Sequence, residues 1–356
     1  MEQQQTHRPA ELVDPAALEQ SLAIAKTVLE QLDMMLLGRG ELHRMVMVGI
    51  LSRGHILLEG VPGVGKTALI KALGQILGLE FKRVQFTPDL MPSDILGAHI
   101  LTQSGDGQRQ MSFQPGPVFT NILLADEINR ASPKTQSALL EAMQERCVTL
   151  LRQTRPLPEP FFVLASQNPI ELEGTYPLPE AQLDRFLLKL VVENVAADVL
   201  ERIISTRRRG ELPPPSAPVA RQQLDELFSI MDRIFLPSAV ARYISRLAAA
   251  THAGAVEASE LVSKYVTYGA SPRAAIAMAE AARAYALLAG RPSVGFEDVK
   301  AVAPAVLNHR IILNYKARFD QVGTFAVIDS LLSSLDEAGL HLPADVRVPK
   351  TQGGQE

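Results

Sequence analysis

The sequence lacks tryptophan, contains a single cysteine and has few aromatic residues, which make up 5% of its 356 positions. One cysteine, Cys147, cannot form a disulfide within the chain, and it cannot build a metal site that needs several thiolates. This scarcity of thiols suits a reducing compartment.

The sequence has no excess of basic residues either. It carries 35 Lys and Arg against 39 Asp and Glu, a formal net charge of −4 at pH 7. It therefore lacks the basic field that attracts a polyanion, which counts against a direct nucleic-acid partner without excluding one.

Long uncharged apolar runs are also missing, since no such run is long enough to cross a bilayer. The polar residues 1–9 lack the apolar segment of a secretory signal. We expect a cytoplasmic protein that meets a membrane only through a partner.

A glycine-rich loop of the pattern GxxxxGKT follows the apolar run 55–59 and precedes a helical pattern. Its glycines let backbone amides wrap phosphates at a helix N-terminus, Lys66 would reach the β- and γ-phosphates, and the Thr67 hydroxyl would hold Mg²⁺. A chance glycine turn is the alternative, and the strand-loop-helix context argues against it. We assign nucleotide binding to Gly60, Pro62, Gly63, Val64, Gly65, Lys66, Thr67 and Ala68.

Two acids end a second apolar run, at residues 122–127. Asp126 would join the Mg²⁺ shell, and Glu127 would polarise the attacking water as general base. Acids commonly solvate strand ends, but downstream of a phosphate loop the pair favours catalysis.

Apolar runs alternate with helical patterns along the first half of the chain. Runs at 84–86, 122–125, 161–165 and 186–192 predict strands, and residues 15–32 and 41–51 predict helices before the loop. Alternating strands and helices predict an α/β fold with a mostly parallel, doubly wound sheet.

The pattern of apolar residues changes after Val192. A proline-rich connector separates the α/β region from patterns that read only as helices, at about 221–230, 238–251, 271–289 and 296–308. We divide the chain into a tail (1–13), an α/β core (14–206), a linker (207–219), a helical lid (220–340) and a second tail (341–356). The arginines 207–209 either form a binding patch or solvate a helix end, and we favour the second.

Several motifs together resemble the MoxR family of AAA+ ATPases. They are residues 125–130 (ADEINR), 166–169 (SQNP), 174–186 (GTYPLPEAQLDRF), 85–95 (QFTPDLMPSDI) and 269–273 (GASPR). The similarity runs from about residue 37 to residue 312. It implies a P-loop AAA+ core with a C-terminal helical lid, ATP in the crevice between them, and a nucleotide contact from Gly38.

The resemblance also implies roles for three side chains. Asn168 would be sensor 1, which orients the lytic water, although Asn-Pro also starts plain turns. Arg185 would be an arginine finger that reaches the neighbouring subunit's γ-phosphate; the alternative is a salt bridge with Asp184 or Glu180.

Arg273 would be sensor 2. Ser271 as N-cap and Pro272 at the first helical position fix it in the first turn of a helix, where a cation opposes the helix dipole and so hints at a bound anion. Its alternative is a pair with an acid. Arg130 either lines a subunit interface near the nucleotide or faces water.

Two hairpins are predicted in the α/β region, at 98–113 and 148–155. In the family the first is an insertion that faces the ring's pore or a partner, and a surface hairpin without a role is the alternative. The histidines show no metal-ligand spacing, so we interpret them as structural or surface residues.

These features predict a Mg²⁺-dependent ATPase. The family resemblance implies a self-assembled ring, most simply a hexamer, that remodels a client protein as its nucleotide state rotates lid against core, with a von Willebrand factor A domain partner on a separate polypeptide. The absence of an NKxD signature favours adenine. A nucleic-acid motor of the same superfamily and a nucleotide-gated adaptor with little turnover are the alternatives.

Overall fold

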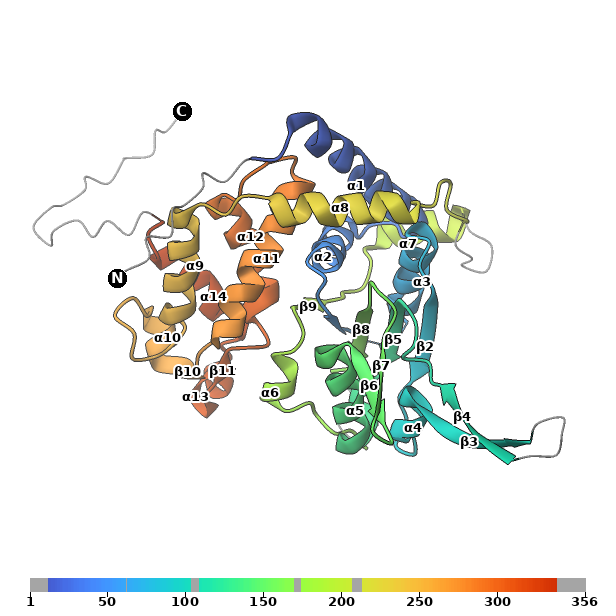
Figure 1. The fold of residues 1–356 in the computed structure, drawn as a ribbon. Coiled ribbons are helices and arrows are strands. Elements are labelled where there is room, and N and C mark those ends of the chain that lie inside the picture. Colours follow the sequence, from blue (N-terminus) through green and yellow to red (C-terminus); the bar gives the residue numbers. More distant parts are fainter. Residues whose placement is uncertain (1–11, 62, 104–108, 170–173, 207–212, 338–356) are drawn as a thin grey trace, which may run out of the picture.

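The computed structural model describes residues 12–61, 63–103, 109–169, 174–206 and 213–337 (Figure 1). At its centre is a five-stranded parallel sheet with the order β2-β5-β8-β1-β9. The strands are β1 (Ile56–Glu59), β2 (Phe81–Gln85), β5 (Ile122–Asp126), β8 (Phe162–Gln167) and β9 (Leu188–Val191). Each predicted strand is therefore confirmed, with its ends shifted by up to three residues.

The two faces of the sheet carry different apolar cores because side chains alternate along each strand. Ile56 and Leu58 of β1 belong to one core, and Leu57 between them belongs to the other. The first face is covered by α1 (Pro15–Met35), α2 (Gly40–Leu51) and α3 (Lys66–Ile76). The second is covered by α4 (Pro92–Leu96) and α5 (Pro133–Glu145), which confirms a doubly wound sheet.

The chain crosses from the sheet to the C-terminal helices on α8 (Arg221–Arg233), which packs along α1 (Figure 1). The C-terminal helices are α9 (Ser238–Ala250), α10 (Glu260–Tyr265), α11 (Pro272–Leu288), α12 (Phe296–Leu307), α13 (Tyr315–Phe319) and α14 (Thr324–Ser334). Their buried side chains, such as Leu247 and Val299, form one continuous core with the first face of the sheet. No helix of the described ranges is long and apolar enough to span a bilayer.

The C-terminal region also holds a short ribbon that the helix-only prediction missed. β10 (Val266–Tyr268) pairs antiparallel with β11 (Ile312–Leu313). The two strands are more than forty residues apart in sequence and have three and two residues, too few for an alternating pattern to be visible.

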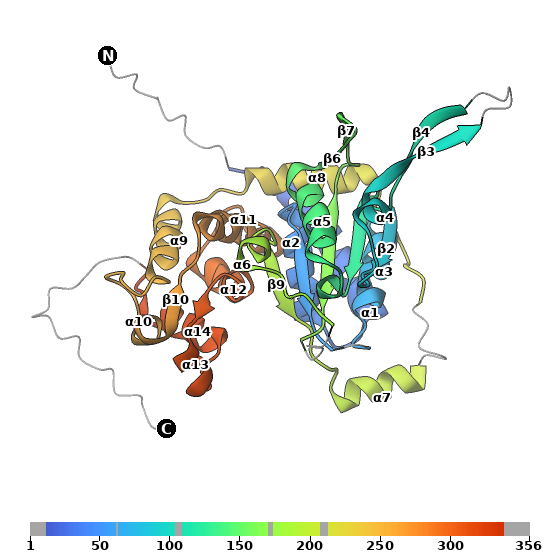
Figure 2. The ribbon, with the colours of Figure 1, turned by 90° about the horizontal axis from the view of Figure 1, so that it is seen from below.

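Both predicted hairpins are confirmed. β3 (Gly97–Gln103) pairs with β4 (Arg109–Pro115) and extends away from the body of the protein (Figure 2), while the turn between them lies outside the described residues. The second hairpin joins β6 (Cys147–Leu150) and β7 (Gln153–Pro156). The Arg155 guanidinium lies 4.0 Å from the centre of the Phe113 ring, so a cation–π contact connects the two hairpins.

His55, just before β1, is a buried histidine whose ring nitrogens both have partners. The Val163 amide donates to Nδ1 at 3.0 Å, so Nε2 carries the proton and donates to the Met143 carbonyl at 3.1 Å. Burial is the main cause that lowers the pKa of His55 from 6.5 to about 4. The folded protein therefore needs this imidazole neutral, and the two backbone partners of its ring nitrogens indicate a structural histidine.

Acidification is expected to destabilise the protein through His55. The folded-state pKa lies below the unfolded one, so the stabilisation is complete above pH 6.5 and is lost as the pH falls towards 4. The loss is about 1.4 kcal/mol for each pH unit in this window. Denaturant titrations at several pH values should show that the free energy of unfolding depends less steeply on pH in His55→Gln, because the variant lacks this titrating imidazole. Some dependence should remain, since other buried histidines still contribute. Equal slopes in both proteins would contradict the assignment.

Candidate functional site

The glycine-rich loop joins the end of β1 to the start of α3. Gly63 and Gly65 have φ angles of +84° and +85°, and a Cβ added to either would meet no atom within 4 Å. Glycine is favoured at both positions because the backbone is in the left-handed region, and not because a side chain would clash with neighbouring atoms. Gly60 differs, because its Cβ would lie 2.6 Å from the Val192 carbonyl oxygen. Pro62 lies outside the described residues.

Lys66 is the first residue of α3 and is only 8% exposed. Its Nζ donates to the Gly60 carbonyl at 2.5 Å, inside the loop. Burial lowers the pKa of Lys66, while the charges of Asp126, Glu127 and, more weakly, Glu59 raise it. The ammonium thus lies at the point where the loop faces the acids of the neighbouring strands.

The rest of the assigned loop follows the strand-loop-helix geometry. Val64 is buried and packs in the core on the α1 to α3 face, while Thr67 and Ala68 are half-buried in the first turn of α3. The first amides of this 11-residue helix have no partner within the helix, and they open towards the loop. The backbone therefore offers an anion-binding site.

Asp126 is the last residue of β5 and is held from both sides. Its Oδ1 accepts from the Ser166 hydroxyl at 2.5 Å, and its Oδ2 accepts from the Arg83 guanidinium at 2.7 Å. The sequence analysis assigned no role to Ser166 or Arg83. Each could have been noticed in the sequence. Arg83 is a basic residue in the middle of an edge strand, and Ser166 carries a hydroxyl two positions before the predicted sensor Asn168.

Glu127 follows in a left-handed backbone conformation with φ 56°. Its amide donates to Ser166 Oγ at 2.9 Å, and its Oε2 accepts from Gln85 at 2.7 Å and from Arg130 at 2.9 Å. Arg130 therefore has an acid of its own chain as a partner, which neither sequence interpretation foresaw. A non-glycine residue in this conformation is strained, as functional residues often are.

Asn168 comes directly after β8 and is 4% exposed. Because β8 lies between β5 and β1, Asn168 follows the strand that separates Asp126 from the loop. The structure thus brings Lys66, Asp126, Glu127 and Asn168 to the carboxyl ends of three adjacent parallel strands, where ligands bind in open α/β sheets.

Gly38 reaches the same edge from the turn between α1 and α2. Its φ is +77°, and an added Cβ would lie 2.7 Å from the Val199 side chain of α7 (Ala197–Thr206). The next residue, Arg39, donates to the Glu193 carbonyl at 3.1 Å, just after β9. The turn therefore lies beside the carboxyl end of β9 and against Val199 of α7.

Arg185 and Arg273 lie at the other end of the strands, which we call the amino edge of the sheet, opposite the carboxyl edge where the glycine-rich loop lies. They line one cavity of about 360 Å³ together with residues that precede β1 and β9, among them His55 and Leu187. Five arginines and two acids line this cavity, so its charge is positive. They are Arg53, Arg146, Arg185, Arg273 and Arg310 against Asp184 and Glu280.

The salt bridges proposed as alternatives for Arg185 are not formed within the described residues. Asp184 instead accepts from Arg310 Nε at 2.8 Å and from the Ser271 hydroxyl at 2.9 Å. Arg310 is itself buried and also donates to backbone carbonyls of residues 184–187. These contacts fix the segment that carries Arg185 to the start of the helix that carries Arg273.

The expectation of ATP in the crevice between the core and the helical lid does not fit this geometry, because Lys66 and Arg273 lie at opposite ends of the sheet strands. β1 separates the loop from the arginine cavity by four residues, about 13 Å of strand. The reason is the path of the chain, since α8 carries it along α1 to the far side of the sheet. There the C-terminal helices dock on β9, where Asn308 donates to the Lys189 carbonyl at 3.0 Å.

Comparisons with known proteins agree with this architecture. Residues 55–188 match the family described as "ATPase family associated with various cellular activities (AAA)", and residues 258–331 match the AAA lid domain. The chain is 44% identical over 301 residues to Chaperone MoxR1 of Mycobacterium tuberculosis, a match that covers 84% of this chain and 78% of that one. It is 31% identical to Protein MoxR of Paracoccus denitrificans, with 84% and 92% of the two chains covered.

A solved structure gives the same result at the level of the fold. The crystal structure of a Cytophaga hutchinsonii protein assigned as an ATPase superimposes with a TM-score of 0.81 at 40% identity, over 90% of this chain and 98% of that chain. The match spans both the sheet and the C-terminal helices.

Proposed function

The chain belongs to the MoxR family of AAA+ ATPases, and from this membership we propose that it hydrolyses ATP to remodel, assemble or activate a client protein. One observation carries the proposal. Lys66, Asp126, Glu127 and Asn168 meet at one edge of the sheet, while Arg185 and Arg273 line a positive cavity at the opposite edge.

The residues at the carboxyl edge would carry out the hydrolytic step. The loop amides and Lys66 bind the phosphates, Asn168 orients the water, and Glu127 takes its proton as it attacks the γ-phosphorus. The hydrogen bonds from Gln85 and Arg130 both go to Glu127 Oε2, so within the described residues Oε1 is the oxygen left to take the proton of the water.

Mg²⁺ would be held beside the phosphates by Thr67 and Asp126. Asp126 Oδ2 accepts two hydrogen bonds from Arg83, whereas among the described residues Oδ1 accepts one, from Ser166, and so has a second lone pair to offer. The half-buried Thr67 hydroxyl is one residue beyond Lys66. These donors fit a hard cation, which would neutralise phosphate charge when bound.

The arginine edge would serve the nucleotide of a neighbouring chain. Arg185 and Arg273 have no ion pair within the described residues, so their guanidinium groups are available for phosphate oxygens. Two chains placed edge to edge would complete one site, and repetition of this head-to-tail contact closes a ring. We propose a hexamer, in the cytoplasm, with a separate von Willebrand factor A domain protein and without direct nucleic-acid binding.

Hydrolysis is expected to depend on assembly and on Mg²⁺. The rate per chain, measured across protein concentrations, should rise together with the mass found by sedimentation, because each site needs two chains. EDTA should abolish turnover. Full turnover by a proven monomer would contradict the shared site, and turnover unaffected by EDTA would contradict the metal assignment.

A further inference from the structure

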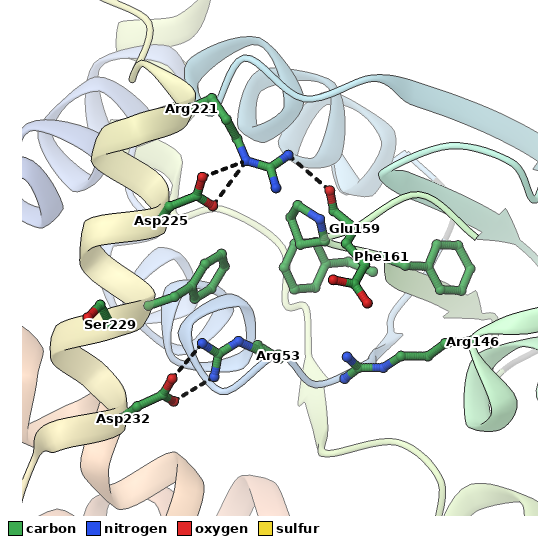
Figure 3. Close-up of a pocket in the computed structure, with 11 residues that line it drawn as sticks. Arg53, Arg146, Glu159, Phe161, Arg221, Asp225, Ser229 and Asp232 are labelled. Carbon is green, nitrogen blue, oxygen red and sulfur yellow. Dashed lines mark hydrogen bonds and ion pairs between the residues drawn. The ribbon is translucent and has the colours of Figure 1, made fainter. Parts of the chain in front are cut away.

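A second cavity, of about 370 Å³, adjoins the arginine cavity at the amino edge of the sheet (Figure 3). It lies between α8 and the segment that enters β8, and Phe161 and Phe228 line it. Arg53 and Arg146 line both cavities, so the two cavities meet at these side chains, and we call the pair the arginine groove.

Arg146 is the shared arginine that has no acidic partner among the residues that the structure describes. Arg53 makes a two-pronged pair with Asp232, at 2.6 and 2.8 Å, and stacks over the Phe228 ring. Arg146 points into the groove, and no ion pair or side-chain hydrogen bond is recorded for it within the described residues (Figure 3). Arg185 and Arg273 likewise form no ion pair within the described residues.

The backbone of Arg146 adds an independent observation. It follows the last residue of α5 in the left-handed region, with φ 51°, a helix-end position that favours glycine. Its amide donates to the Ala142 carbonyl and its carbonyl accepts from the Leu157 amide, both at 3.0 Å, so this conformation is fixed on both sides. An arginine is kept here at a conformational cost of about 1 kcal/mol.

We propose that Arg146 is a third cation of the inter-subunit site, which contacts the terminal phosphates of the nucleotide bound by the adjoining chain. The proposal rests on the proposed function, because it needs the arginine edge to face a neighbour's loop. A planar guanidinium binds two phosphate oxygens at once, and three such groups around one cavity match the charge of a triphosphate end.

A structural role for Arg146 makes different predictions. A cation after a helix C-terminus interacts favourably with the helix dipole, and lysine would serve that purpose as well. If this were its whole role, glycine at the position would lose a charge effect and leave turnover unchanged. Comparison of stability with turnover therefore separates the two roles.

The test uses Arg146→Gly, with Arg146→Lys as the matched charge control. We expect Arg146→Gly to melt at or above the parent's temperature, to bind ATP equally well at its own loop, and to lose turnover roughly 10- to 100-fold. Arg146→Lys should lose nearly as much, because it keeps the charge without the fork. Arg146→Asn, which also tolerates the left-handed conformation, replaces the glycine variant if that fails to fold.

Mixed rings decide whether the contact is made across the subunit boundary. Lys66→Ala chains should bind ATP weakly but offer intact arginines, so mixing them with Arg146→Gly chains should restore part of the turnover. Parent-like turnover in Arg146→Gly would overturn the inference, and so would a loss that mixing does not restore. Arg185→Ala, mixed in the same way, tests the proposed function by itself: if it loses turnover and is restored while Arg146→Gly is unaffected, only the inference fails.

Discussion

Glu127→Gln is expected to reduce ATP hydrolysis roughly 10²- to 10³-fold while ATP binding persists. The carboxylate is the only general base proposed for the lytic water, and glutamine cannot accept its proton. Glutamine keeps the size of the side chain and can still accept a hydrogen bond from Arg130, whose bond to Glu127 is 2.9 Å long. Single-turnover hydrolysis and calorimetric ATP binding, measured on the same preparation, give the two quantities.

Lys66→Ala is the matched control for this result. It removes the ammonium that lies inside the loop, so it should weaken ATP binding itself, whereas Glu127→Gln should trap bound ATP. Parent-like turnover in both variants would refute the enzyme interpretation and favour a nucleotide-gated adaptor. The trapped Glu127→Gln ring is also the form in which a purified candidate partner should bind most persistently.

Arg185→Ala is expected to reduce turnover on the order of 10³-fold, the effect usual for a finger that stabilises phosphoryl charge from a neighbouring chain. ATP affinity at the variant's own loop should stay within a few-fold of the parent, because Arg185 lies at the opposite edge of the sheet. Steady-state turnover and calorimetry on the assembled protein measure the two effects.

Mixing experiments define this prediction further. Arg185→Ala and Lys66→Ala should each turn over slowly on their own, but a mixed assembly would join an intact loop to an intact arginine at some boundaries and should recover part of the turnover. A mixture that stays inactive although both chains co-assemble would place Arg185 in its own chain's site. Glu180→Ala is a suitable control, because Glu180 lies on the short α6 (Glu180–Leu183) and forms no ion pair with Arg185 in the part of the chain that the structure describes, so the variant should leave turnover unchanged.

Features that depend on neighbouring residues could be predicted from the sequence. The strand-loop-helix at Lys66 follows from an apolar run, glycines and an amphipathic stretch, and the parallel sheet follows from strands that alternate with helices. The convergence of Asp126 and Asn168 with the loop follows from the same topology, since parallel strands end at one edge.

Features that depend on the path of the chain could not be predicted. The sequence fixes Arg273 in the first turn of its helix, but only the docking of α8 on α1 decides at which edge of the sheet that helix begins. Arg83 and Ser166 reach Asp126 from strands some forty residues away on either side, so no local pattern marks them. Arg146 could not be predicted either, because only the folded chain brings it to the same cavity as Arg185 and Arg273.

The continuous apolar core has a mechanical consequence. Leu58 of the sheet and Leu247 of α9 belong to the same packed interior, so a hinge between the two halves of the chain would have to open that interior to water. A nucleotide-driven movement that keeps this interior packed would therefore take place between neighbouring chains, and not as the expected rotation of lid against core within one chain. It would carry with it the β3–β4 hairpin, which extends away from the body of the protein (Figure 2).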